Sequence, residues 1–215
     1  MEYNLRSDLE KAIVSYPKLK IKEENGSLEL VGEIDLIHSE RNLLIETFSV
    51  NIFYPKEFPY CFPKVIETGD QIPRSNDRHV NKDTTLCLVI EPEERLLCLH
   101  GITTVLFIEK VLLPRLGEEY TVNKGGKYVR EYSHGIKGLW EFYFFKFKSN
   151  DPKVILQLLE SITTQNIPKR SKACPCGSGN VFKKCHINSV IEINRLGRLY
   201  LKSNYYILMN NVYEK

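Results

Sequence analysis

The 215-residue chain lacks several features that would assign it quickly to a class of protein. No apolar run reaches the roughly 18 residues that a transmembrane helix needs, and the polar N-terminal stretch MEYNLRSDLEKAIV does not have the pattern of a secretory signal peptide. Blocks of like charge, internal repeats and low-complexity tracts are also missing. We therefore expect a cytoplasmic protein with no membrane segment.

The composition excludes little else. Charged residues make up 27% of the chain and hydrophobic residues 42%, as in an ordinary soluble globular protein. The net charge of +3 is a mild excess that requires neither a nucleic acid nor a membrane as partner. Six cysteines without an export signal indicate reduced thiols, which serve as metal ligands, as a nucleophile or in the core rather than in disulfides.

The first part of the chain has the pattern of an α+β domain. Residues 7–10 (SDLE) form a capping box before a helical apolar repeat, and Pro17 limits that helix. The period then changes to two, with Asn25-Gly26 marking a hairpin turn. The strand-like runs lie at 19–37, 43–55 and 64–69. An N-terminal helix followed by a four-stranded antiparallel meander is the predicted fold.

The second part is richer in helical patterns. Residues 101–116 predict a largely buried helix that stops near Pro114 and Gly117. The aromatic run 138–148 is compatible with a strand or a helix, and the pattern alone does not choose between them. Residues 150–152 (Asn-Asp-Pro) are typical of a helix start. Several C-terminal helices are therefore expected.

A cysteine-rich patch concentrates three cysteines and one histidine between residues 174 and 186. Three thiolates and one imidazole complete a tetrahedral zinc shell and leave no position open for a substrate, which predicts a structural Zn²⁺. Gly177 and Gly179 permit the tight turn that such a site needs. The alternative is two unrelated pairs of buried cysteines. The predicted ligands are Cys174, Cys176, Cys185 and His186.

The same patch resembles the SEC-C motif, a small zinc knuckle found at the C-terminus of the SecA translocation motor and in many bacterial proteins. The resemblance rests on CPCGSG at 174–179, on Phe182-Lys183-Lys184 and on Cys185-His186. It implies structural zinc and a small docking surface rather than a reaction. The knuckle has too little apolar content to fold alone, so we expect the metal to supply most of its stability.

Among the remaining cysteines, Cys61 and Cys98 have apolar neighbours that favour packing roles. Cys87 differs because it follows a polar stretch, 70–85, that is longer than most loops in a compact domain. His79 and Asn81 supply donors close to it in the sequence. Spacing alone leaves a nucleophile and a buried strand cysteine as alternatives.

The order of these elements resembles ubiquitin-conjugating enzymes, and in particular the bacterial ubiquitin-conjugating-like proteins of conjugation and antiphage-defence operons. Three features depart from the family pattern: Val80 stands where a proline is expected, the gap before the cysteine is short, and the single Trp140 lies far downstream. The matching residues are Tyr54-Pro55, Phe58-Pro59, Phe62-Pro63, His79, Asn81, Leu86, Cys87 and Leu88.

This resemblance implies a cysteine transferase. Cys87 would accept a ubiquitin-like protein as a thioester from an adenylating activating enzyme and pass it to an amine on a protein target. Asn81 would donate to the oxyanion, and His79 would order the loop. Glu118 or Glu119 would be the acid that desolvates the amine.

Three other functions stay open. The fold could be a non-catalytic module or adaptor that recognises a ubiquitin-like partner, with the knuckle for docking. A cysteine hydrolase would pair Cys87 with His100 or His134. The lysines beside the knuckle could contact a nucleic acid, but the interleaved aromatic residues needed for base stacking are missing, so we expect no nucleic-acid partner. The expected division of the chain is a catalytic domain at 1–162, a linker at 163–172, the knuckle at 173–187 and a tail, helical in part, at 188–215.

Overall fold

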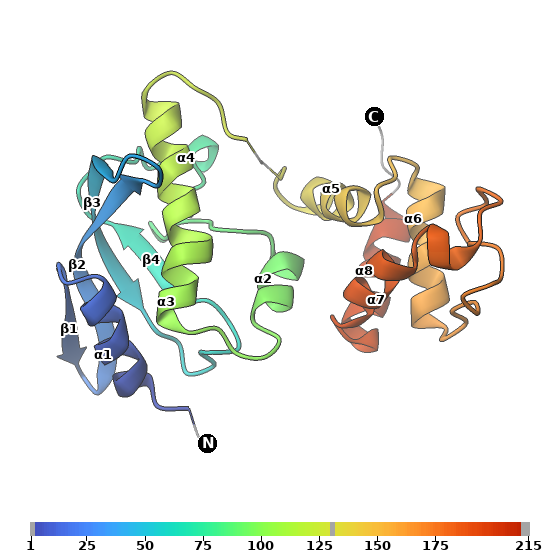
Figure 1. The fold of residues 1–215 in the computed structure, drawn as a ribbon, viewed down its shortest axis with the longest axis horizontal. Helices are drawn as coiled ribbons and strands as arrows, with labels where there is room; N and C mark the ends of the chain where they lie inside the picture. The colour runs from blue at the N-terminus through green and yellow to red at the C-terminus, as the bar shows by residue number, and fades with distance from the viewer. Residues whose placement is uncertain (1–2, 130–131, 212–215) are drawn as a thin grey trace. The chain divides into compact units, whose positions relative to one another are not determined.

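The structure is a computed structural model that describes residues 3–129 and 132–211 (Figure 1). The chain forms two compact units, and each has a hydrophobic core of its own. The first unit comprises Met1–Val89 and Leu97–Arg130, and the second comprises Ile90–Leu96 and Glu131–Lys215. None of the helices in the described ranges combines the length and the apolar character that crossing a bilayer requires.

The first unit is an α+β structure with a four-stranded antiparallel sheet in the order β1-β2-β3-β4, so the predicted meander is confirmed. Asn25 and Gly26 have φ angles of 50° and 77° between β1 and β2, which is the left-handed geometry that an Asn-Gly hairpin turn favours. In chain order, the first unit begins with α1 (Leu5–Ser15), β1 (Leu19–Glu24), β2 (Ser27–His38), β3 (Leu43–Phe53), β4 (Lys64–Glu67) and η1 (Asn76–Arg78).

Helix α1 begins earlier than the capping box predicted. Its N-cap is Asn4, whose side chain accepts a hydrogen bond from the backbone N–H of Ser7 at 3.0 Å. Asparagine is as good an N-cap as serine, so the earlier residue fixes the start. The buried Asp8 carboxylate accepts from the backbone N–H of Thr104 at 2.8 Å, which connects α1 to the segment that starts the long helix.

The apolar helix predicted at 101–116 exists but does not stop at Pro114 or Gly117. It is built from α3 (Thr104–Phe107), the π-helical segment η2 (Ile108–Leu112) and α4 (Leu113–Asn123). Pro114 falls in the first turn of α4, where a missing N–H is tolerated. The wider π turn just before it absorbs the break in the hydrogen-bond ladder, so the helix continues. It lies across one face of the sheet (Figure 1).

The second unit is helical, and the aromatic run that could have been a strand is the helix α5. Trp140, Tyr143 and Phe147 are spaced as one helical face and are at most 1% exposed. Asp151 caps α6 by accepting from the backbone N–H of Lys153 at 2.9 Å, as the Asn-Asp-Pro pattern predicted. The elements are α2 (Glu91–Leu97), α5 (Ile136–Phe147), α6 (Pro152–Thr163), η3 (Phe182–Lys184), α7 (Ile187–Asn194) and α8 (Arg198–Asn210).

These units divide the chain differently from the expected scheme of domain, linker, knuckle and tail. Residues 131–162 lie in the second unit rather than in a domain that runs from 1 to 162. The segment 163–172, expected as a linker, lies within that same unit. The tail at 188–215 is helical as far as it is described, and α8 packs on α6. The knuckle is thus one side of a helical core and not an appendage.

Candidate metal centre and thiol loop

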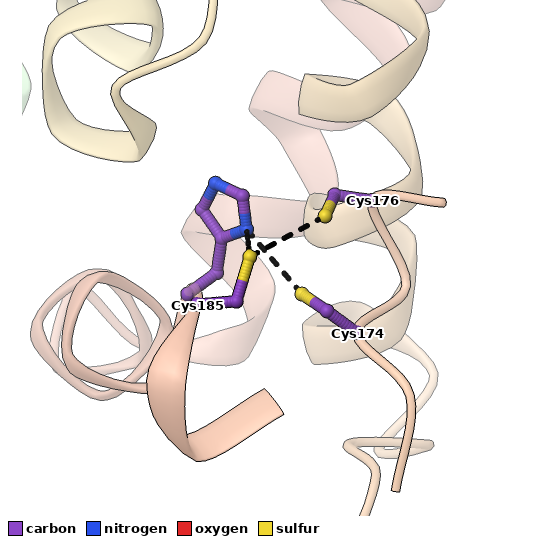
Figure 2. Close-up of side chains that lie close together, drawn as sticks. Cys174, Cys176 and Cys185 are labelled. Atoms are coloured by element: carbon purple, nitrogen blue, oxygen red, sulfur yellow. Dashed lines mark hydrogen bonds between the residues drawn. The ribbon is translucent and has the colours of Figure 1, made fainter. Parts of the chain in front are cut away.

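The four predicted metal ligands come together in the second unit. One ligand atom from each of Cys174, Cys176, Cys185 and His186 lies within 4.8 Å of the others. Figure 2 shows the three labelled thiols directed toward a common point. The Cys176 and Cys185 sulfurs are 3.6 Å apart. This donor set and its compactness fit a small tetrahedral ion such as Zn²⁺.

A short antiparallel pairing positions the two N-terminal thiols. Ala173 and Val181 form an isolated β-bridge, and the backbone N–H of Cys174 donates to the carbonyl of Asn180 at 2.8 Å. Gly177 and Gly179 have φ angles of 74° and 75°. Only glycine adopts that conformation at no steric cost, so the chain can reverse within a few residues. The turn and η3 together bring the two pairs of ligands face to face.

The imidazole of His186 is oriented with Nδ1 toward the thiols and Nε2 toward the backbone. Its Nδ1 lies 3.3 Å from the Cys174 sulfur and 3.1 Å from the Cys185 sulfur. Its Nε2 lies 2.8 Å from the carbonyl oxygen of Phe147. A proton on Nε2 that is donated to this carbonyl leaves the Nδ1 lone pair directed at the sulfurs, which is the tautomer a metal requires.

The thiols differ in how readily they ionise. Burial is the largest influence on Cys174 and raises its pKa to about 12. Burial also opposes ionisation of Cys176, but hydrogen bonding to Ser178 and to the neighbouring thiols outweighs it and lowers the pKa to about 6. The Cys176 sulfur and the Ser178 Oγ are 3.1 Å apart. Lys172, Lys183 and Lys184, which lie close to the cluster in the sequence, are exposed.

The sequence profile of the SEC-C motif matches residues 170–188, the segment that carries this cluster. The match covers only the knuckle and says nothing about the first unit. Searches of curated proteins and of solved structures gave no significant match. These comparisons therefore assign the knuckle to a motif and assign no family to the chain as a whole.

Cys87 ends a small hairpin in the first unit. Val80 and Leu86 form an isolated antiparallel bridge, and the backbone N–H of Cys87 donates to the carbonyl of His79 at 2.7 Å. The backbone N–H of Leu86 donates to Val65 of β4 at 2.7 Å, which anchors the hairpin to the sheet. Cys87 is half-buried and its pKa is raised, chiefly by burial and against an opposing influence of Arg115. Cys61 is also half-buried, and Cys98 lies in the core.

His79 and Asn81, the two residues predicted to assist Cys87, lie in the same hairpin, and each contacts another side chain. His79 adopts a left-handed φ of 51°, and its ring packs in a T-shaped arrangement with the ring of Tyr128, with the centroids 5.3 Å apart. The side-chain amide of Asn81 is exposed and donates to the Thr85 hydroxyl at 3.0 Å. Thr85 takes one of the two N–H donors of this amide, which leaves the second for an oxyanion.

Glu119 is not a surface acid. It is fully buried, and its carboxylate accepts hydrogen bonds from Arg78, Arg115 and Tyr128. Glu118, by contrast, is a quarter exposed and lies 3.6 Å from Arg115. Sequence reasoning missed the arginines. The i,i+4 spacing of Arg115 and Glu119 on a helix could have indicated their pairing, but no local signal connects either residue to Arg78.

Proposed function

We propose that the first unit is a ubiquitin-conjugating-like cysteine transferase and that Cys87 is its acyl carrier. The observation that carries the proposal is the placement of Cys87. It is a half-buried thiol at the end of a hairpin that follows a four-stranded meander and precedes the long helix. This order of elements, with His79 and Asn81 in the hairpin, is the basis of the resemblance to ubiquitin-conjugating enzymes.

The proposed reaction has two transfers. The Cys87 thiolate attacks the carbonyl carbon of the thioester on an adenylating activating enzyme, a new C–S bond forms, and the electron pair of the old bond leaves with the sulfur of the activating enzyme. An amine of a protein target then attacks the Cys87 thioester. It loses a proton to solvent, and Cys87 leaves as a thiolate. Thiolates leave well, so little acid catalysis is needed at this step.

The proposal includes a structural zinc ion in the second unit. The ion would be held by the sulfurs of Cys174, Cys176 and Cys185 and by the Nδ1 atom of His186. This assignment fits the distances between the four atoms and the hydrogen bond from His186 Nε2 to the carbonyl oxygen of Phe147. Bound zinc would keep the thiols ionised and hold the two halves of the knuckle together. Four protein ligands leave no site for a substrate, so the metal would have no part in the transfer.

The experiment is thioester formation with a matched adenylating enzyme and its ubiquitin-like protein. We expect an adduct that reductant removes, that is absent in Cys87→Ala and that becomes resistant to reductant in Cys87→Ser. Cys61→Ser is the matched control, because that residue is another half-buried cysteine of the same unit. An adduct that survives in Cys87→Ala would contradict the assignment.

The second candidate is a non-catalytic module that binds the ubiquitin-like protein without a covalent bond. The raised pKa of Cys87 favours it, because burial leaves little thiolate at neutral pH. Binding of the ubiquitin-like protein that is unchanged in Cys87→Ala, together with no thioester in the wild-type protein, would select this function.

A further inference from the structure

The group of polar side chains behind the thiol hairpin has no place in the proposed reaction as described so far. Glu119 is fully enclosed, and Arg115 is 6% exposed. Arg78 and Arg115 both donate to the Glu119 carboxylate, and the Tyr128 hydroxyl donates to it at 2.7 Å. Two guanidinium groups share one carboxylate at the centre of this group. Buried charges are usually balanced by partners of opposite sign.

Arg115 is the least satisfied member of the group. Its Nε is buried and has no hydrogen-bond partner among the described residues. Its Nη1 lies 3.6 Å from the carboxylate of Glu118, which is beyond hydrogen-bond distance, and its guanidinium stacks over the Tyr128 ring at 4.8 Å. Glu119 and the ring hold the guanidinium in place, so its positive charge is fixed rather than free to move into solvent.

Two adjacent carbonyl groups connect the Arg115 guanidinium to the backbone of Cys87. Arg115 donates to the carbonyl of Arg78 at 3.3 Å, and the backbone N–H of Cys87 donates to the carbonyl of the next residue, His79, at 2.7 Å. The guanidinium and the cysteine backbone therefore hold the same dipeptide. The positive charge of Arg115 also lowers the pKa of Cys87, against the larger raising effect of burial.

We propose that Arg115 is a positioning residue for Cys87, a buried fixed cation that stabilises negative charge on the sulfur. The inference rests on the proposed acyl transfer for its purpose. The sulfur is an anion when it attacks the donor thioester and again when it leaves after transfer to the amine. One fixed positive charge assists both steps and needs no reorganisation during the reaction.

The geometry assigns different tasks to the other charged groups that face Arg115. Glu119 fixes the orientation of Arg115 through Oε1, and Arg78 binds the other carboxylate oxygen, Oε2, through its Nε at 3.0 Å. Glu118 is the one carboxylate close to Arg115 that is partly exposed among the described residues, so it screens the cation to a small extent. Neutralising Glu118 should therefore strengthen the effect of Arg115 on the thiol, whereas neutralising Arg115 should remove it.

The test is the pH dependence of alkylation of Cys87 by iodoacetamide in the whole 215-residue chain, followed peptide by peptide with mass spectrometry. In Arg115→Gln we expect the midpoint of the profile to move to higher pH and the rate at pH 7 to fall about three- to tenfold, since one pKa unit is a tenfold change in thiolate. Arg115→Lys, which keeps the charge, should retain most of the rate. Cys61 in the same samples is the internal standard.

Glu118→Gln keeps the test decisive if Arg115→Gln does not fold. Removing this negative charge should move the midpoint to lower pH and speed alkylation about twofold at pH 7. A Cys87 profile that is unchanged in Glu118→Gln, or rates that fall equally in the Gln and Lys variants of Arg115, would overturn the proposal and leave Arg115 as a packing residue. No ubiquitin-like protein enters this assay, so its outcome is independent of whether a thioester forms.

Discussion

Loss of one ligand from the cysteine and histidine cluster should loosen the whole second unit. Cys185→Ser tests this with little change in side-chain volume, since it replaces only a sulfur by an oxygen at a half-buried position. The residues beside the C-terminal ligand pair, Phe182 and Ile187, are 1% and 7% exposed and belong to the same core as Trp140. Fully burying one such side chain contributes about 1.5–3 kcal/mol, so releasing both costs about 3–6 kcal/mol.

The sequence supplies a selective probe for this experiment. Trp140 is the one tryptophan of the chain, it is 1% exposed, and its indole N–H donates to the carbonyl of Asn211 at 3.0 Å. Its fluorescence during urea denaturation therefore follows the second unit. With a urea dependence of about 1–3 kcal/mol per molar for a small domain, we expect the midpoint to fall by about 2 M. Treating the wild-type protein with a strong zinc chelator should have the same effect.

Cys61→Ser is the matched control because the same exchange in the first unit removes no cluster ligand. Its Trp140 transition should coincide with that of the wild-type protein, and its zinc content should equal that of the wild-type protein. If Cys185→Ser unfolds at the wild-type urea concentration, the helical core holds the knuckle without the metal, and the reasoning from Phe182 and Ile187 is refuted.

Three single contacts lead to further predictions. Glu119→Gln should lower the free energy of unfolding of the first unit by about 3–5 kcal/mol, because the buried Arg115 and the largely buried Arg78 lose their counter-charge; circular dichroism in urea measures this, and an effect as small as that of Glu118→Gln would contradict it. Gly138→Ala should destabilise the second unit by about 1–3 kcal/mol or more in the Trp140 assay, because the new Cβ atom would lie 1.9 Å from the carbonyl oxygen of Ser133. An unchanged urea midpoint would show that the backbone near Ser133 can move away from the new Cβ atom at little cost. Asn81→Ala should slow acyl transfer to an amine by about 10²-fold, the low end for loss of an oxyanion donor, because the amide has one N–H group left after its hydrogen bond to Thr85. A rate within about twofold of wild type in single-turnover discharge would remove Asn81 from the reaction.

The sequence predicted the local structure well where one short pattern decides the conformation. The Asn25-Gly26 turn, the alternating strands and the Asp151 cap each depend on neighbours within a few residues, and each is found as expected. The cluster of three cysteines and one histidine also forms locally, because two glycines and a short spacing are enough to bring three sulfurs and an imidazole together.

The errors arise where distant residues decide. Pro114 usually ends a helix, but the π-helical turn before it relieves the strain, and nothing in the local pattern indicates such a turn. Glu119 was a candidate for the acid beside the acceptor amine, but its carboxylate binds Arg78, which lies 41 residues earlier in the chain. Such pairings depend on the tertiary structure and are not visible in one sequence without relatives.

The division into two units also decides how Cys87 has to be studied. The chain leaves the first unit directly after Val89, contributes Ile90–Leu96 to the second unit and then returns. Within the second unit, the Arg95 guanidinium stacks over the Tyr200 ring at 4.3 Å, and Ile90 and Leu96 pack against the helical core. A chain truncated near residue 130 would lose these partners of a segment that starts three residues after the thiol. Loss of Cys87 reactivity in such a truncated chain would therefore not distinguish the exposure of this segment from the loss of the metal site. Substituting single cluster residues in the whole chain separates these two causes.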